Sequence, residues 1–584
     1  MQQALMRIHS NSDKFKQVTN YKLSSMIHQY FWVWIILILL FRLWLISSQN
    51  LHAIGNAGYD DLLFVKLASH IIRGEWLGPF DQLTLTKGSF YPIWIALSYP
   101  FGLPLLVMQH LLYLIASVFF VYVFRKSNIH AVFLLVLFAL LAFNPSTTAL
   151  PANRVTRDFF YGSETLIVFA AIFGLFFAFK NQKKTIIWCI ILGFSLIPFV
   201  LTREEGVWIA PAYVFANLYL VLSSPKNKSY QEKIKRTALL CIPLVILFTG
   251  TSLIKLKNLI EYGVWINTEF QADYFKAAYG SLTRVRHDHW QRYVNVPYDV
   301  RKKIYEISPA FAELEPYLEG NLLHVWTRSG CKKLNICDDY SSHFVWAFRH
   351  AVSLAGYYRS ELTAKDYYTR LASEVNQACE QEKLKCYPPR KTMLPVFHEE
   401  YVSLILQEFL HMLKYVATFE DTSSLRVPKN KGTTSQLRLF EEITHYNNLI
   451  PKTITYVSGD IENESGLSIT LRECKKNAMY FIAKGYQVVV PGFFVISLLC
   501  FICALEKSTR SGLSLLTTFS IIILAAFLSR LLLLSYLDLT SFHAFSLLYN
   551  MPSYILLLIF SEFSLYDTFW NNRVAPDSKN VWNN

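Results

Sequence analysis

Charged residues are scarce in this 584-residue chain. Asp, Glu, Lys and Arg together make up 17% of it, whereas hydrophobic residues make up 53% and aromatic residues 16%. The mean hydropathy is +0.27. A soluble protein of this length exposes much more charge, so the composition excludes an ordinary soluble enzyme and predicts a polytopic membrane protein.

Acidic residues are scarcer still, with 42 Asp and Glu against 56 Lys and Arg, for a net charge of +14. A basic chain suggests nucleic acid as a partner, but here the positive residues lie in short loops between apolar runs. That distribution is typical of the cytoplasmic loops of membrane proteins. We therefore expect no nucleic-acid partner, and the lipid bilayer is the first partner predicted.

Two kinds of signature are also missing. Neither Gly-x-x-x-x-Gly-Lys-Ser/Thr nor Gly-x-Gly-x-x-Gly occurs in the chain, so these nucleotide-binding loops are excluded. No small-residue cleavage site follows the first apolar run, residues 30–48. This run is predicted to be an uncleaved membrane anchor that delivers the following residues to the outside.

Ten apolar runs predict an all-α polytopic fold. The alternation of basic and non-basic loops places both termini inside, in the inner (cytoplasmic) membrane of a bacterial-type cell. The predicted spans lie near residues 30–48, 103–124, 131–149, 163–179, 185–201, 206–223, 237–256, 487–504, 511–533 and 545–562. The predicted parts are a tail 1–29, a membrane module 30–257 with external loop 49–90, an extracytoplasmic domain 258–485, C-terminal spans 486–562 and a tail 563–584.

The extracytoplasmic domain is predicted to be mainly helical. Amphipathic patterns occur over residues 310–318, 344–358 and 367–379, and Thr363 with Asp366 resembles a helix-start signal before the third of them. Weaker patterns predict short strands over residues 453–457 and 467–471.

Four cysteines of this domain form two close pairs, Cys331 with Cys337 and Cys379 with Cys386. Neither spacing is that of a zinc ribbon, so two local disulfides in an oxidising compartment are favoured. Cross-pairing of the four is the alternative. Cys474 would then be left over outside, and the remaining cysteines lie in spans.

An acidic pair, Asp60 and Asp61, follows the first span by about ten residues. Residues 62–73 then show the one-sided apolar pattern of a helix lying in the membrane interface. Two adjacent carboxylates at such a place do not both ionise freely, so the pKa of one should rise unless a cation compensates. The pair suits a general base or an ion ligand. The plainer interpretation is a solvated helix start.

Other charges recur at the same predicted membrane face. They are Arg157, Asp158 and Glu164 around the fourth span, Arg203 in the next short external loop, and Arg530 in a late apolar run. Each has a structural explanation alone, but ionisable groups at a membrane are costly and usually functional. Together they predict one site, because arginine binds phosphate with two parallel hydrogen bonds and a carboxylate can take a proton from an acceptor.

An acidic pair after the first span, a juxtamembrane helix, many spans and an external domain resemble the GT-C glycosyltransferases, which include protein O-mannosyltransferases and the aminoarabinose transferases of lipid A. Tyr59-Asp60-Asp61 is similar to the family's Asp-Glu motif, with Asp in the second position. The resemblance implies that Asp60 is the catalytic or metal-binding acid of the first loop. The family's second acid maps to Asp158 or Glu164.

Taken with the charged residues, the resemblance implies an inverting transferase that uses a polyprenyl-phosphate-linked sugar and an envelope glycan, lipid or protein as acceptor. Asp60 is the expected base, and Asp61 together with one of Asp158 or Glu164 is expected to orient it or to hold a cation. Arg157, Arg203 and Arg530 are expected to bind the lipid phosphate. A divalent cation (Mg, Mn or Ca) held by Asp60 and Asp61 is the one cofactor considered. The alternatives are a transporter or lipid flippase and a non-enzymatic scaffold that binds an envelope partner.

Overall fold

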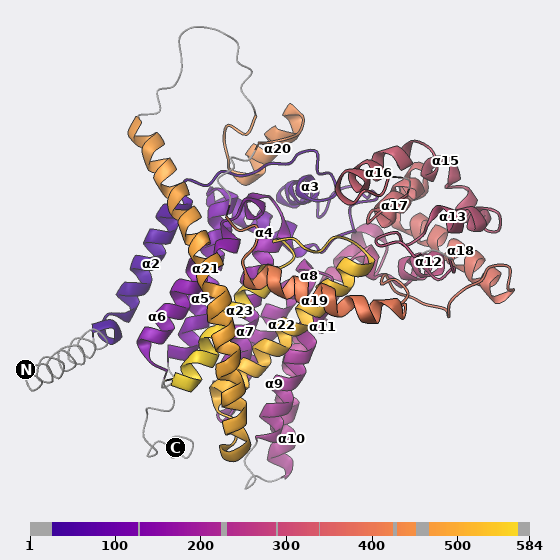
Figure 1. Ribbon diagram of the computed structural model, residues 1–584. Helices are drawn as coiled ribbons and strands as arrows, with labels where there is room; N and C mark the ends of the chain where they lie inside the picture. Colours follow the sequence, from indigo (N-terminus) through magenta and orange to yellow (C-terminus); the bar gives the residue numbers. More distant parts are fainter. Residues whose placement is uncertain are drawn as a thin grey trace, which may run out of the picture.

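The structure, a computed structural model, describes residues 26–125, 129–223, 230–287, 290–337, 339–423, 429–450 and 466–569. Within these residues the fold is all-α. Strand pairing there is limited to isolated bridges, Ile54 with Lys431 and Val285 with Cys386. The predicted all-α membrane fold is therefore confirmed, and the helices divide into a bundle, a lateral helical domain and the loop between them (Figure 1).

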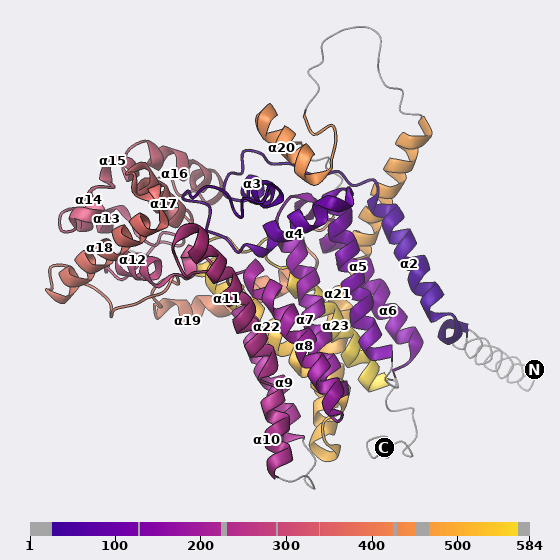
Figure 2. The same ribbon diagram turned by 180° about the vertical axis from the view of Figure 1, so that it is seen from behind.

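The helices of the bundle run roughly along one direction in both ribbon views (Figures 1 and 2). They are α2 (Phe31–Ile46), α5 (Leu105–Arg125), α6 (Ala131–Ala142), α7 (Arg157–Ala178), α8 (Gln182–Thr202), α9 (Ala210–Leu222), α10 (Tyr230–Leu239), α11 (Ile242–Tyr262), α21 (Gly466–Ser511), α22 (Leu515–Thr540) and α23 (Met551–Phe569). Each predicted span overlaps one of them. In the described residues, six helices are long and apolar enough to cross a membrane. Shorter apolar helices begin at Phe31, Ala131 and Gly206.

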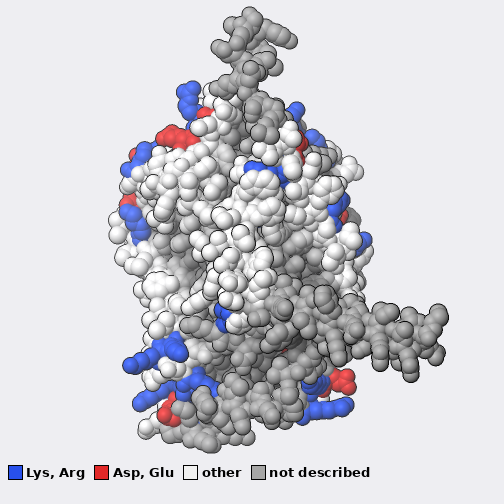
Figure 3. Space-filling model, turned by 90° about the vertical axis from the view of Figure 1, so that its left-hand side faces the viewer, with Lys and Arg blue, Asp and Glu red and all other residues white. Residues whose placement is uncertain are grey.

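The core of the bundle is apolar and aromatic. α7 and α23 lie at its centre and are buried along most of their length. Aromatic rings interlock there, as where Phe173 packs on Phe519 with ring centroids 4.4 Å apart. Figure 3 shows the outer surface: on this face charged side chains lie toward the upper and the lower end, and the middle is largely uncharged. Such a belt is expected of a surface that faces lipid.

The lateral domain has a hydrophobic core of its own. Its helices are α12 (Asp273–Thr283), α13 (Tyr298–Tyr305), α14 (Pro309–Ala312), α15 (Glu315–Leu318), α16 (Asn321–Leu334), α17 (Phe344–Leu354) and α18 (Glu361–Glu380). Phe275, Phe348 and Tyr368 are fully buried within it. Disulfides join Cys331 to Cys337 and Cys379 to Cys386, the local pairing expected from the sequence.

Two details differ from the sequence-based predictions. The predicted strand 467–471 is wrong, because α21 begins at Gly466 and is helical through these residues. Extending an existing helix is cheaper than starting a separate element, since nucleation has already been achieved. α18 starts at Glu361, two residues before Thr363, because the hydroxyl of Ser360 caps it by accepting from the Thr363 N–H. The other predicted strand, 453–457, lies outside the described residues.

Two helices of the predicted external domain pack on other parts. α19 (Glu400–Ala417) buries Met412 and Val416 in the core of the bundle. α20 (Thr434–Thr444) buries Leu437 and Phe440 against the helix of the first external loop, α3 (Asp61–Ile72). The described residues within 258–485 therefore do not pack as one body; residues of α12–α18 form the separate hydrophobic core.

The loop 49–90, predicted to be external and called the first external loop here, lies between the bundle and the lateral domain. It contains α3, and α4 (Phe90–Ser98) follows it. The Glu269 N–H donates to the carbonyl oxygen of Leu85 at 2.8 Å. The buried guanidinium of Arg349 contacts both the Glu269 carboxylate and the carbonyl oxygen of Gln82. These contacts fasten residues 82–85, and so the position of Lys87 just after them, to the lateral domain.

The predicted sidedness can be tested by cysteine labelling in a chain whose exposed cysteines, Cys241, Cys474 and Cys503, are replaced by Ser. Lys183→Cys lies in the first turn of α8, next to the connection from α7, and Lys303→Cys lies on α13; both lysines are exposed. An impermeant maleimide applied to intact cells should modify only the Lys303→Cys variant. Modification of Lys183→Cys from outside would overturn the topology.

Candidate functional site

A large polar cavity lies where the first external loop, the loop ends of the bundle and the lateral domain meet. Its volume is about 1340 Å³. Its charged lining is Asp60, Lys87, Arg154, Arg157, Asp158, Arg203, Glu204 and Glu205, with His343, His350 and His543 as further titratable groups. Within the described residues, charged side chains from several elements converge on this cavity at one end of the bundle.

The two carboxylates of the acidic pair point to different surroundings. Asp61, at the start of α3, is fully buried, and Arg154 contacts both its oxygens, at 2.6 Å through Nη2 and 3.2 Å through Nε. Asp60 has 54% of its side chain exposed, toward the cavity, and pairs with Lys87. Asp61 therefore anchors α3 to the segment that leads into α7, and Asp60 is left to face the cavity.

The pKa values of the pair are split accordingly. Burial raises the pKa of Asp61, and the opposing effect of Arg154 does not fully cancel it. Burial also acts to raise the pKa of Asp60, but Lys87, Arg154 and Arg157 outweigh it and lower that pKa below its ordinary value. Asp60 is therefore ionised at neutral pH while Lys87 stays beside it.

Lys87 is held in a narrow setting. Its ammonium group lies 5.3 Å from the ring of Phe64 and 5.7 Å from the ring of Trp346. The next residue, Gly88, leaves no room for a side chain, because a Cβ atom there would lie 1.9 Å from the carbonyl oxygen of Leu201. This close approach lets the Gly88 N–H donate to Glu204 at 2.9 Å, which ties the loop to the bundle.

The arginines on the bundle side are also paired. Arg157, in the first turn of α7, forks onto the Glu204 carboxylate at 2.9 and 3.0 Å. Arg203 contacts Asp158 at 2.7 Å and Glu205 at 2.9 Å. Burial acts to raise the pKa of Glu205, but Arg203, Arg530 and Arg157 outweigh it and lower that pKa to about 2. Cations and carboxylates thus neutralise one another at this end of the bundle.

Four of the seven charged residues predicted from the sequence line the cavity, namely Asp60, Arg157, Asp158 and Arg203. Asp61 lies behind it, on Arg154. Glu164 is buried one turn and a half deeper in α7 and accepts from the Thr202 hydroxyl at 2.9 Å. Arg530 is also buried: it donates to the carbonyl oxygen of Tyr549 and lies 3.9 Å from Glu205. These three residues support the wall of the cavity from behind.

Sequence reasoning missed two parts of the lining. One is Lys87, although it is the single charged residue between Asp81 and Arg125, and an isolated charge beside apolar helices is a usable signal. The other is a group of aromatic side chains from the lateral domain, which no spacing in the chain connects to Asp60. His543 also lines the cavity, and its Nδ1 lies 3.2 Å from Asp538.

The lining does not fit the divalent cation considered from the sequence. Both oxygens of Asp61 are taken by Arg154, and Asp60 faces Lys87 with Arg154 and Arg157 nearby. Hard metal ions need several converging oxygen ligands, and the acidic pair does not offer them while its oxygens are engaged by these cations. Among the described residues no group of three or more His, Cys, Asp or Glu side chains is arranged to hold a metal ion.

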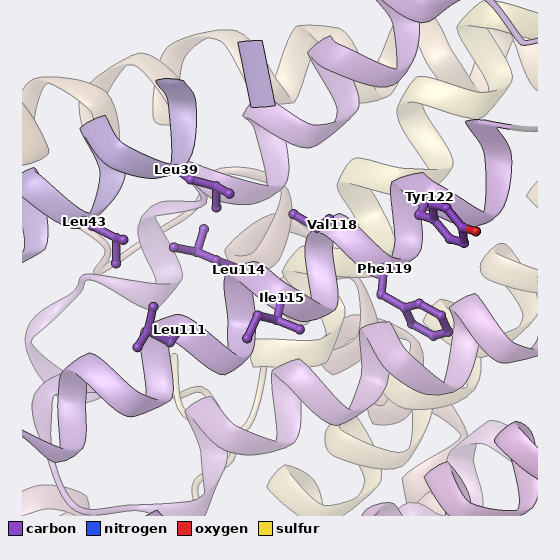
Figure 4. A pocket seen from close by; sticks show the side chains of 8 residues that line it. All are labelled: Leu39, Leu43, Leu111, Leu114, Ile115, Val118, Phe119 and Tyr122. Atoms are coloured by element: carbon purple, nitrogen blue, oxygen red, sulfur yellow. The ribbon is translucent and has the colours of Figure 1, made fainter. Parts of the chain in front are cut away.

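A second hollow, between α2 and α5, has a different character (Figure 4). Its volume is about 450 Å³, and its side chains are Leu39, Leu43, Leu111, Leu114, Ile115, Val118, Phe119 and Tyr122. The lining is apolar apart from the tyrosine hydroxyl, so this hollow offers no chemistry of its own.

No family model matches the chain, and no curated protein matches it. Among solved structures, the crystal structure of ArnT from Cupriavidus metallidurans in the apo state is similar, with 12% sequence identity and a TM-score of 0.31. The match covers 89% of this chain and 77% of that one. Similarity at this level supports no conclusion about chemistry, which rests on the residues of the cavity.

The assignment of Asp61 as an anchor makes a prediction about stability. Asp61→Asn leaves the partly buried Arg154 without its charged partner, and the expected cost is about 1–3 kcal/mol. Thermal unfolding of the purified protein in detergent should therefore begin at a lower temperature than in the wild type. Glu75→Gln, which alters an exposed carboxylate, is the matched control and should unfold like the wild type. An unchanged Tm for Asp61→Asn would contradict the anchoring role.

Proposed function

We propose that this protein is an integral membrane glycosyltransferase of the GT-C type, which moves a sugar from a polyprenyl-phosphate-linked donor to an extracytoplasmic acceptor. The observation that carries the proposal is the cavity itself. It combines a carboxylate facing open space, Asp60, with three guanidinium groups and an ammonium group. A reaction that expels a phosphate and deprotonates an acceptor needs this combination.

The bundle side of the cavity is the proposed phosphate subsite. Arg157 is 12% exposed and Arg203 4% exposed, so Arg157 is the more accessible of the two. Arginine holds a phosphate through two parallel hydrogen bonds, and a lipid phosphate entering from the bilayer would reach this side first. Arg530, buried behind Glu205, would act by holding Glu205 and Arg203 in place and not by touching the donor.

The proposed step is a single inverting displacement. An acceptor hydroxyl oxygen attacks the anomeric carbon of the donor sugar while the bond from that carbon to the phosphate oxygen breaks. The electron pair leaves with the polyprenyl phosphate, whose negative charge is stabilised by the arginines. The hydroxyl proton passes to Asp60, the proposed general base.

Lys87 gives this step a way to raise the basicity of Asp60. In the resting cavity Lys87 neutralises Asp60, which lowers its pKa. An incoming phosphate competes for the same ammonium group. When Lys87 turns toward the phosphate, Asp60 loses its nearest cation and becomes a better proton acceptor as the donor binds.

The transporter alternative needs polar residues along a path through the bilayer. The described residues that line the cavity come from loops, helix ends and the lateral domain. Arg42, the charged residue in the first span, is buried in α2 and donates to the Thr147 hydroxyl at 2.8 Å. The location of the charge therefore favours a reaction at one membrane face. A scaffold, the third alternative, would tolerate loss of Asp60.

The first test is Asp60→Asn, which keeps the shape of the side chain but not its basicity. Transfer from a labelled polyprenyl-phosphate sugar should fall by about 10²–10⁴, with normal expression and little change in Tm. Glu75→Gln, on the same loop but outside the cavity, should retain wild-type transfer. Undiminished transfer by Asp60→Asn would falsify the assignment of the base. No transfer by the wild type across a donor panel would favour the transporter.

The second test addresses the phosphate subsite. Arg157→Lys keeps the charge but loses the fork, and a charge-assisted hydrogen bond contributes about 1.5–3 kcal/mol. The KM for the donor should therefore rise by roughly 10- to 100-fold, with a smaller effect on the KM for the acceptor. Arg73→Lys, a substitution of an exposed arginine that does not line the cavity, serves as the control. An unchanged donor KM in Arg157→Lys would remove Arg157 from the subsite.

A further inference from the structure

Part of the cavity lining is aromatic. Tyr59, which precedes Asp60, packs edge-on against Trp326 and Trp346, with ring centroids 5.0 and 5.2 Å apart. Phe270 packs on Trp346 at 5.2 Å. These four side chains are here called the aromatic wall, and all of them line the cavity. Trp326 comes from α16 and Trp346 from α17, so the lateral domain supplies most of the wall.

The wall contains polar atoms that the protein leaves without partners. The indole N–H of Trp326 is enclosed by protein but has no hydrogen-bond acceptor in the described part of the chain, and the same is true of Nδ1 of His350. The rings of Trp326 and His350 lie 6.5 Å apart. Because both nitrogens are enclosed by the protein, the wall meets a ligand through the faces and edges of its aromatic rings.

A pyranose ring matches this combination. One face of such a ring presents C–H groups that carry partial positive charge, and these pack favourably on the negative face of an aromatic ring. Its hydroxyls accept and donate hydrogen bonds at the edge. A cationic ligand fits less well, because the ammonium group of Lys87 already lies 5.7 Å from the Trp346 ring and would repel it.

We propose that the aromatic wall is the acceptor subsite and that it binds a pyranose ring, which makes the acceptor a glycan. This rests on the proposed function and narrows its acceptor class. The wall belongs largely to the lateral domain, whereas the arginines belong to the bundle from which a lipid donor arrives. Asp60 lies between them, next in sequence to Tyr59 and paired with Lys87. A sugar on the wall therefore presents a hydroxyl to the base while the donor occupies the arginine side.

The test measures binding directly and needs no turnover. The full chain in lipid nanodiscs is mixed with methyl pyranosides of glucose, galactose, mannose and N-acetylglucosamine, and saturation-transfer NMR detects contact with the sugar C–H protons. Trp326→Ala should weaken binding of the preferred sugar by about tenfold, as expected for loss of an aromatic platform. Trp326→Phe keeps an aromatic ring but not the N–H, so its affinity for the preferred sugar should lie between those of the wild type and Trp326→Ala. Binding by this variant shows that the subsite stays folded after a conservative substitution.

Trp290→Ala is the matched control. Trp290 lies in sequence between α12 and α13 of the lateral domain, and its indole N–H donates to Tyr401 at 2.8 Å. It does not line the cavity, so sugar binding by Trp290→Ala should stay at the wild-type level. Equal binding by wild type and Trp326→Ala, or no binding of any of the four sugars, would overturn the proposal.

A final measurement separates acceptor from donor. Saturating polyprenyl phosphate, and then the intact lipid-linked sugar, are added before the methyl pyranoside. The acceptor assignment predicts that the pyranoside signal persists with both, because donor and acceptor occupy different walls. If the lipid-linked sugar displaces the methyl pyranoside and polyprenyl phosphate does not, the wall binds the donor sugar instead, which would overturn the proposal. This experiment detects binding without catalysis. A protein that binds the sugar but transfers none would therefore contradict the proposed function, and it would leave sugar binding by the aromatic wall intact.

Discussion

The cavity depends on one buried chain of charges, which runs from Asp158 through Arg203 to Glu205 and on to Arg530. It links the start of α7, the short loop after α8 and the middle of α22. Buried ion pairs gain little stability overall, but removing one member leaves an uncompensated charge and costs several kcal/mol. The chain therefore fixes how three helices meet at this end of the bundle, and the position of Arg157 and Glu204 follows from it.

Mutual neutralisation also determines how the site responds to a ligand. Lys87, Arg154, Arg157 and Arg203 each have a carboxylate partner in the resting cavity. An anion such as a lipid phosphate must therefore compete with an existing pair. The pair of Lys87 with Asp60 is the easiest to open, because the Asp60 side chain is half exposed whereas Asp61 and Asp158 are buried. Ligand binding and release of the base are thus coupled through one lysine.

Much of this arrangement could be predicted from the sequence, and the part that could not has a physical reason. Long apolar runs determine helices almost regardless of context, because an unpaired backbone is too costly in lipid, so α5, α7 and α22 were located well. The acids and arginines near their ends were found by the same logic, since charge at a membrane is rare. What sequence could not show was the direction of each side chain: nothing in Asp60-Asp61 reveals that one faces Arg154 and the other Lys87. The aromatic wall was unpredictable for a further reason, because Trp326 and Trp346 lie more than 250 residues from Tyr59 and meet it only through tertiary packing.

The two walls of the cavity come from parts of the chain that fold around separate cores, and the first external loop holds them in register. On one side Glu269 and Arg349 fasten residues 82–85 to the lateral domain. On the other side Glu204 fastens Gly88, two residues beyond Thr86, to the bundle. Lys87 lies between these two attachments. A shift of the lateral domain against the bundle would act directly on the residues that flank Lys87, and hence on its contacts with Asp60 and Trp346. The loop therefore makes the alignment of the two walls and the pairing of the base depend on the same few residues.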